Sequence, residues 1–350
     1  FDQRTLPEED LRLLYMEYVP AGGLDAVIDR VIETPVSDRR GQLLLGVVDQ
    51  ALLARGETPP TDSMLHERLA NASWAETVCV IGAQLARALA YAHARGVLHR
   101  DVKPANVLLG RTSEAKLADF IISYSNQLEG SSAAAYLGGS MAYMSAEQLE
   151  ACSPVHNRDP DALDARIDIF SLGVLLFELL TGERPYIEDD TLRGGWTTAM
   201  QEMIDRRRAG PAEERLALVP DDAPRLLLPT LLRCLHPDPD ERFRDAADVA
   251  QQLELALLPR AADLISPPED SRAHFVRRHA IISVLGGGLL PNAILSVLNV
   301  RFNMQGSVLK YDPFMDLVMV VNAVVYALGI GFALRWTQQL ARTSRRVAGG

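Results

Sequence analysis

Cysteine is scarce in this chain, and a net positive charge is lacking altogether. The three cysteines, Cys79, Cys152 and Cys234, lie far apart and include no Cys-x-x-Cys pair, which argues against a disulfide framework or a zinc site and fits a reducing compartment. The formal net charge of -11 argues against a general affinity for nucleic acid, because a polyanion binds to a basic surface. The 350 residues suffice for one large domain or two smaller ones.

A string of acid, base and amide side chains lies in the first half of the chain. Residues 99–106 read His-Arg-Asp-Val-Lys-Pro-Ala-Asn, and Asp119-Phe120 follows thirteen residues later. Phosphoryl transfer needs a carboxylate that accepts the proton of the attacking hydroxyl (Asp101) and an ammonium that neutralises the transferred group (Lys103). An amide (Asn106) and a second carboxylate (Asp119) suit magnesium ions that bridge phosphates. The string therefore predicts magnesium-assisted phosphoryl transfer.

This string resembles the catalytic and magnesium-binding loops of the protein kinase superfamily. The lysine two residues after Asp101 is the version typical of serine/threonine kinases, and over residues 11–258 the resemblance is to bacterial kinases of the eukaryotic type. It implies an α+β kinase-like fold with a mainly α-helical C-lobe and a remnant of the N-lobe sheet. It also implies ATP and Mg²⁺ as cofactors, and a serine or threonine hydroxyl of a protein as acceptor.

The resemblance assigns further residues to the nucleotide. Residues 11–20 alternate weakly and then become apolar, as expected of the last N-lobe strand running into the hinge. Met16 then matches the gatekeeper position beside adenine, and the backbone of Glu17 and Val19 is expected to pair with the adenine edge. Leu108 matches the side chain beneath adenine. From the residues alone, an ordinary strand and a plain core leucine remain the alternatives.

Seven further positions match residues that support the catalytic loop or the activation segment of the family: His99, Arg100, Phe120, Ser140, Glu147, Asp168 and Arg242. Asp168 is expected to accept hydrogen bonds from the catalytic-loop backbone, and Arg100 is the usual counter-ion of an activation-segment phosphate. Glu147 and Arg242 are expected to form a largely buried ion pair.

Two residues depart from the family pattern. Ile121 stands where the family has the glycine of Asp-Phe-Gly, and a β-branched residue should restrict the flip of that loop. Ala146 replaces the proline of Ala-Pro-Glu. Neither change removes a predicted metal ligand.

Helices are predicted on both sides of the catalytic loop. A short one is expected over residues 24–34, and an insertion over 35–72, interpreted as a packed surface excursion, contains another over 42–55. Ser73 and Glu76 have capping-box spacing and begin an amphipathic helix that ends at Gly96. Residues 168–180 are nearly apolar all round, as expected of a helix buried through a lobe.

The C-terminal part contains two uncharged apolar runs, about 21 residues from Ala280 and about 18 from Leu317, each near the length that spans a bilayer core. Arginines flank the pair on its outer sides, which places both ends in the cytoplasm. We expect a multi-pass protein of a bacterial inner membrane, in contact with the lipid bilayer, and a homodimer through these helices, whose glycines allow close contact. Two buried helices of a soluble domain are the alternative.

In the expected division of the chain, the kinase part consists of an N-lobe remnant with the hinge (1–20) and a C-lobe (21–258) with its insertion (35–72). A linker (259–279), a first membrane helix (280–300), an external loop (301–316), a second membrane helix (317–335) and a basic tail (336–350) follow. No glycine-rich phosphate loop, Val-Ala-Ile-Lys-like strand or glutamate-bearing helix precedes Met16. The first interpretation is a truncated form of a longer kinase. The alternative is a pseudokinase that serves as a scaffold or interaction protein at the membrane.

Overall fold

The computed structural model describes residues 2–6, 11–15, 17–60, 63–120, 141–187, 195–265 and 272–279, together with single positions between 283 and 335. The chain divides into two compact units, Phe1–Pro259 and Arg260–Gly350. The first unit carries the predicted catalytic loop, and its described part is mostly helical with two small sheets.

Two antiparallel strand pairs form these sheets. Strands β1 (Asp2–Leu6) and β2 (Leu11–Tyr15) pair with each other, so the strand expected over residues 11–20 is present and ends at Tyr15. Strands β3 (Val107–Leu109) and β4 (Ala115–Leu117) follow the catalytic loop directly. The segment after the predicted hinge lies along β3: Leu109 N–H donates to Gly22 O at 2.9 Å, and Leu24 N–H donates to Val107 O at 2.8 Å.

The predicted helix over 24–34 is confirmed as α1 (Asp25–Glu33), and the one over 42–55 as α2 (Gly41–Ala54). Helix α3 (Met64–Ala70) and the 3-10 turn η1 (Val36–Asp38) complete the insertion. The insertion is more than a surface excursion, because α2 contributes buried side chains to the main core: Leu44, Leu45, Val48 and Leu52. Buried Arg39 joins it to the rest, donating to Thr34 O at 3.0 Å and Thr181 O at 2.9 Å.

Helix α4 (Trp74–His93) delivers the chain to the catalytic loop, and its capping box is formed as predicted. Glu76 N–H donates to Ser73 Oγ at 3.2 Å, and Ser73 N–H donates to the Glu76 carboxylate at 2.8 Å. The indole Nε1–H of Trp74 donates to Leu179 O at 2.9 Å, which joins the start of α4 to the end of the next core helix. The helix stops at His93, and Gly96 follows with a φ of 73° in the connection to the catalytic loop.

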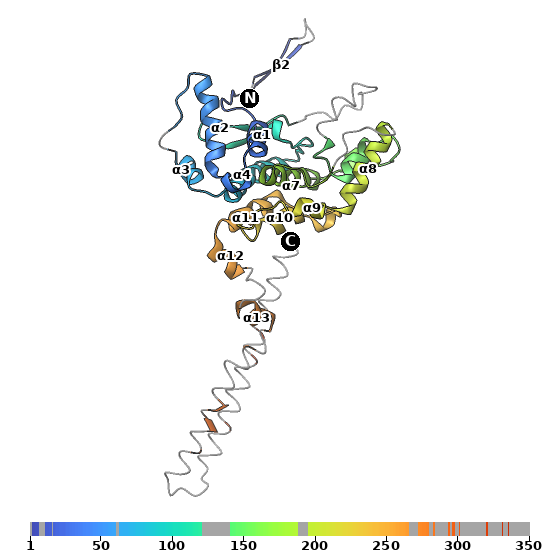
Figure 1. Ribbon diagram of the computed structural model, residues 1–350. Helices are drawn as coiled ribbons and strands as arrows, with labels where there is room; N and C mark the ends of the chain where they lie inside the picture. Colours follow the sequence, from blue (N-terminus) through green and yellow to red (C-terminus); the bar gives the residue numbers. More distant parts are fainter. Residues whose placement is uncertain are drawn as a thin grey trace. The chain divides into compact units, whose positions relative to one another are not determined.

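Helix α7 (Arg166–Thr181) is the buried helix predicted over 168–180, and it ends at Gly182 in a left-handed conformation, with φ 83°. It packs against α4, α1 and α10 (Leu227–Cys234), and α11 (Ala246–Ala256) packs on α4 (Figure 1). Three further helices of the unit are α6 (Ala146–Cys152), α8 (Trp196–Ala209) and α9 (Glu213–Leu216). Its other 3-10 turns are η2 (Pro104–Asn106), η3 (Pro160–Ala162) and η4 (Pro239–Glu241). A largely helical C-lobe is therefore observed.

The range expected to be a linker contains helical structure. Residues 259–279 contain two short helices, α12 (Pro259–Ile265) and α13 (Arg272–Arg278), and His279 N–H donates to Phe275 O at 2.8 Å. The predicted membrane helices, the loop between them and the basic tail lie almost entirely outside the described residues. Within the part of the chain that the structure describes, no helix is both long enough and apolar enough to cross a bilayer.

Two helical glycines are predicted to have opposite effects on stability when each is replaced by alanine, because only Gly173 lies where α7 closely approaches the C-terminal end of α10. A Cβ on Gly173 of α7 would lie 2.8 Å from Cys234 Cβ, whereas a Cβ on Gly46 of α2 would meet nothing within 4 Å. We expect Gly173→Ala to lower the free energy of unfolding by about 1–3 kcal/mol through overpacking. Gly46→Ala should raise it by about 0.5–1 kcal/mol, because alanine loses less backbone entropy in a helix. Urea unfolding of the full chain measures both, and equal effects would contradict the close approach.

Candidate active site

The backbone of the catalytic loop is bonded to one buried carboxylate on α7. Asp168, 1% exposed, accepts a hydrogen bond from His99 N–H at 2.8 Å and from Arg100 N–H at 2.7 Å, as the resemblance implied. The ring of His93, at the end of α4, lies with Nε2 2.8 Å from the same carboxylate and therefore donates to it. Sequence reasoning missed His93, although its position in the last helical turn before the loop was visible.

Two residues of the site have left-handed backbone conformations that side-chain-bearing residues rarely adopt. The φ angle is 66° at Arg100 and 59° at Asp119. Such conformations cost on the order of 1 kcal/mol or more and persist where surrounding contacts enforce them. At Arg100 both backbone groups have such contacts, since its N–H donates to Asp168 and its C=O accepts from Gln148 Nε2 at 2.7 Å. Gln148 is a second residue that sequence reasoning missed.

The carboxylate of Asp101 lies among the other predicted catalytic groups. Lys103 Nζ is 2.7 Å from Asp101 Oδ2, and Asn106 Nδ2 donates to the same oxygen at 3.0 Å and to Asp101 O at 2.8 Å. Among the described residues no hydrogen bond reaches Oδ1 of Asp101. The structure thus brings three of the predicted residues together, with one carboxylate oxygen left for the proton of a hydroxyl.

His99 joins the catalytic loop to the loop that carries Asp119. Its Nδ1 accepts from Asp101 N–H at 3.3 Å, so the proton lies on Nε2, which donates to Ala118 O at 2.8 Å. Burial lowers the pKa of His99, which keeps the ring in this neutral form near pH 7. The ring also packs against Phe120, with centroids 4.5 Å apart. Ala118 N–H donates to Asn106 O at 2.8 Å, so the two predicted metal-ligand positions are linked through the backbone.

The donor set fits magnesium. The amide nitrogen of Asn106 is occupied by Asp101, which leaves its Oδ1 for a cation, and the Asp119 carboxylate is exposed to solvent. No group of three or more histidine, cysteine or carboxylate side chains that could hold a metal occurs among the described residues. A pair of oxygen ligands is nonetheless the usual protein share of a magnesium site, where phosphates and water complete the coordination.

The nucleotide side is described only in part. Leu108 is half-buried and forms a bridge with Gly23, so the residue expected beneath adenine lies beside the segment that follows the hinge. Val19 is also half-buried. The Glu17 carboxylate accepts from Lys116 Nζ at 2.7 Å, and this hydrogen bond lowers the pKa of Glu17. Met16 lies outside the described residues. So do Ile121, Ser140 and the part of the activation segment between these two residues. Adenine pairing by the backbone of residues 17–19 stays a prediction.

Glu147 and Arg242 form the expected ion pair. Arg242 Nη1 and Nη2 donate to the two Glu147 oxygens at 2.5 and 3.1 Å, and the residues are 1% and 5% exposed respectively. Arg242 Nε also donates to His236 O at 2.7 Å. Ala146 begins α6 without the proline of the family pattern, and Ser145 caps this helix with its hydroxyl. The pair therefore joins α6 to the segment around η4.

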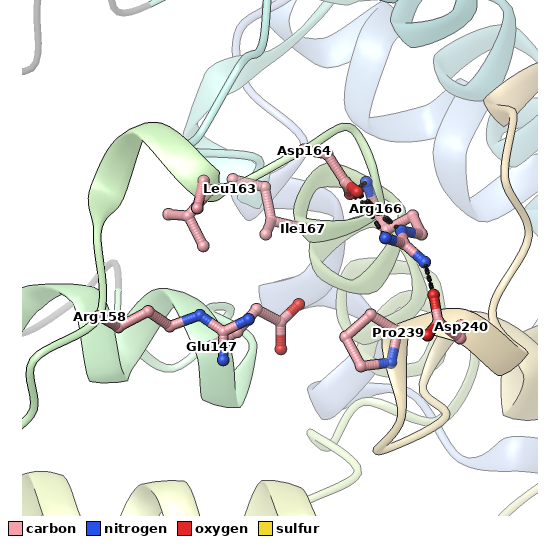
Figure 2. A pocket seen from close by; sticks show the side chains of 9 residues that line it. Glu147, Arg158, Leu163, Asp164, Arg166, Ile167, Pro239 and Asp240 are labelled. Carbon is pink, nitrogen blue, oxygen red and sulfur yellow. Dashed lines mark hydrogen bonds and ion pairs between the residues drawn. The ribbon is translucent and has the colours of Figure 1, made fainter.

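A pocket of about 200 Å³ lies beside this pair, and its lining includes Glu147 but no residue of the catalytic loop (Figure 2). In it Arg166 lies between Asp164 and Asp240, with ion-pair distances of 2.6 and 2.5 Å. Arg158 on the opposite side pairs with Glu150 at 2.9 Å. The charged groups named here therefore already have oppositely charged partners among the described residues, and the pocket carries no functional assignment.

Comparisons with known proteins agree with this geometry. Residues 57–253, more than half of the chain, match the family model described as the protein kinase domain. Serine/threonine-protein kinase PknB of Mycolicibacterium smegmatis is 31% identical over 175 residues, which are 49% of this chain and 25% of that protein. A probable serine/threonine-protein kinase of Clostridium acetobutylicum is 31% identical over 170 residues, 49% of this chain and 23% of that protein.

Serine/threonine-protein kinase PknL of Mycobacterium tuberculosis is 29% identical over 209 residues, 60% of this chain and 44% of that protein. The matched region thus covers between 23 and 44% of the length of these three relatives.

The buried pair gives a prediction on stability. Arg242→Met would leave the Glu147 carboxylate buried without its partner, so we expect the free energy of unfolding to fall by about 3–5 kcal/mol. The double variant Glu147→Leu/Arg242→Met should recover part of that loss, because no unpaired charge remains. As a control, Arg30→Met removes an exposed pair with Glu33 and should cost under about 1 kcal/mol. Equal losses in the single and double variants, by urea unfolding, would count against the argument.

Proposed function

The chain belongs to the protein kinase family, and on that premise we propose that it transfers the γ-phosphate of Mg-ATP to a serine or threonine hydroxyl of a protein. The observation that carries the proposal is the position of Asp101, with Lys103 and Asn106 on one carboxylate oxygen and no described hydrogen bond on the other. The family match and the relatives named serine/threonine-protein kinase support the same activity.

Each catalytic group has a role that its contacts suit. Asp101 orients the attacking hydroxyl and accepts its proton. Lys103, bonded to Asp101, places a positive charge where the transferred phosphoryl group gains negative charge. Asn106 and Asp119 are the residues that would hold magnesium, which supplies charge neutralisation of the phosphates when bound. His99 and Asp168 fix the backbone that carries these side chains.

The competing function is that of a catalytically impaired scaffold at the membrane, for which Ile121 in place of glycine is the motivating feature. A rigid residue there would restrict the loop that carries Asp119. Both functions predict a folded kinase-like domain. They differ in whether Mg-ATP binding leads to phosphoryl transfer.

Membrane anchoring by residues 280–300 and 317–335 is the second part of the proposal. Support comes from three apolar side chains at helical positions in these runs, Ile294, Val297 and Val320, which are 52, 66 and 59% exposed. Exposed apolar side chains in uncharged runs of this length suit a lipid environment. With arginines on both outer flanks, the kinase domain and the C-terminus would lie on the cytoplasmic side, and the two helices would offer a surface for a homodimer.

A phosphotransfer assay tests the first part. With the full chain, Mg-ATP and a model protein substrate, Asp101→Asn should lower kcat by at least about 100-fold, because general-base catalysis contributes about 10²–10⁴. The same variant should retain the magnesium-dependent thermal stabilisation by ATP, and Asp119→Ala should lose it. Equal rates for wild type and Asp101→Asn would refute the mechanism. ATP binding without any transfer would favour the scaffold.

Alkaline extraction of cell membranes tests the second part. The full chain should remain with the membrane pellet, and Ile294→Arg/Val297→Arg should release it, since each arginine in a spanning helix costs about 2.5–3.5 kcal/mol on insertion. Ile32→Arg is the matched control, because Ile32 is also an exposed isoleucine, 60% accessible, but lies in the first unit. Release of the wild-type chain would refute anchoring.

A further inference from the structure

Gln148 lies at the start of α6 with only 3% of its surface exposed. Its side-chain Nε2 donates to Arg100 O at 2.7 Å, whereas its Oε1 is buried and has no partner among the described residues. The orientation of the amide is determined by this contact, because the flipped amide would place two acceptor oxygens against each other. A buried glutamine therefore directs one donor at the backbone of the catalytic loop.

The carbonyl that it contacts belongs to the peptide that joins Arg100 to Asp101. The N–H of the same peptide donates to His99 Nδ1 at 3.3 Å, so both polar atoms of the peptide have side-chain partners. The preceding peptide is bonded through Arg100 N–H to Asp168. Because Arg100 has an unfavourable left-handed φ of 66°, these contacts determine the direction in which the chain enters Asp101.

Helix α6 is itself firmly placed. Glu147, the residue before Gln148, forms the buried bidentate pair with Arg242. On the N-terminal side, residues 141–145 are contacted by α8: buried Arg207 donates to Ala142 O at 3.0 Å and to Met144 O at 3.2 Å. These residues belong to the loop that the family resemblance identifies as facing the protein substrate. A continuous series of contacts thus runs from α8 through this loop and α6 to the catalytic loop.

We propose that Gln148 is a positioning residue that couples the substrate-facing loop and α6 to the backbone of Asp101. The inference rests on the proposed function and deepens it. It proposes that Gln148, a residue outside the catalytic string, controls the geometry of the general base Asp101. A displacement of α6 changes the distance from Gln148 Nε2 to Arg100 O. It thereby changes how firmly this hydrogen bond holds Arg100 in its left-handed conformation, directly before Asp101. Catalysis depends on such geometry, since small misplacements of a catalytic group lower kcat.

The test uses Gln148→Met, which keeps the length and burial of the side chain and removes the donor. In the full chain, amide hydrogen exchange of residues 99–106 should become faster by about fivefold, the size expected for the loss of one hydrogen bond of average strength. With Mg-ATP and a protein substrate, kcat should fall by a similar factor, while KM for ATP changes less than about twofold.

Gln84→Met is the matched control. Gln84 also makes one short hydrogen bond to the backbone, accepting from Ala115 N–H at 2.7 Å, but it lies on α4 beside β4. We expect this variant to leave kcat and the exchange of residues 99–106 unchanged. Gln148→Asn, which keeps the amide but is one methylene shorter, serves as a milder second variant should Gln148→Met fold poorly. It should show the same direction of change.

The two readouts separate this inference from the proposed function. If the wild-type chain transfers no phosphate, the proposed function fails, and hydrogen exchange alone still decides the role of Gln148. Faster exchange in the Gln148 variants but not in Gln84→Met supports the coupling. Unchanged exchange in the Gln148 variants, or an equal increase in all three variants, overturns it. In an active enzyme, a rise in KM for ATP with unchanged kcat would overturn it as well.

Discussion

The carboxylate of Asp168, bonded to two successive backbone N–H groups, is the constraint on which the candidate site depends. Asp168 lies in the first turn of α7 and is almost completely buried, so its two oxygens must find donors within the chain. The donors are the N–H groups of His99 and Arg100 together with the His93 ring. Since unpaired burial of such an anion would be costly, the loop is forced into the strained conformation that presents Asp101.

Arginine makes several further long-range connections of the first unit. Lysine occurs at three positions in the chain, Lys103, Lys116 and Lys310, within a total of 35 basic residues. Three buried arginines, Arg39, Arg207 and Arg242, each donate to a backbone carbonyl that is distant in the sequence: Thr181 O, Ala142 O and Arg166 O respectively. The planar guanidinium offers several donors in a fixed geometry and suits this task better than an ammonium. The two described lysines instead pair with carboxylates, Lys103 with Asp101 and Lys116 with Glu17.

The sequence was informative where chemistry imposes fixed spacing. The groups around Asp101, the anchor Asp168 and the partners Glu147 and Arg242 were all found, because the family motif relates their positions in the chain. The capping box at Ser73 and the apolar helix α7 were also predicted, since caps and burial follow from local residues. The insertion was located but its contribution to the core through α2 was not, because which face a helix buries depends on its neighbours.

His93, Gln148 and Lys116 escaped prediction for a related reason. Each has an ordinary residue type for its helix or strand, and its importance comes from a partner far away in the chain: Asp168, Arg100 and Glu17 respectively. The two short helices in residues 259–279 were missed because prolines and mixed charges there favour a linker when read locally.

The separations of these partners along the chain bear on how the domain folds. Asp168 meets His99 across 69 residues, Arg242 meets Glu147 across 95, Trp74 meets Leu179 across 105, and Arg39 meets Thr181 across 142. Contacts between distant residues form slowly, because the entropy of closing a large loop must be overcome first. The catalytic loop is thus expected to acquire its shape only after α7 has been built and packed. A nascent chain that has emerged only as far as Phe120 holds the whole catalytic string and yet lacks Asp168, the residue that arranges it.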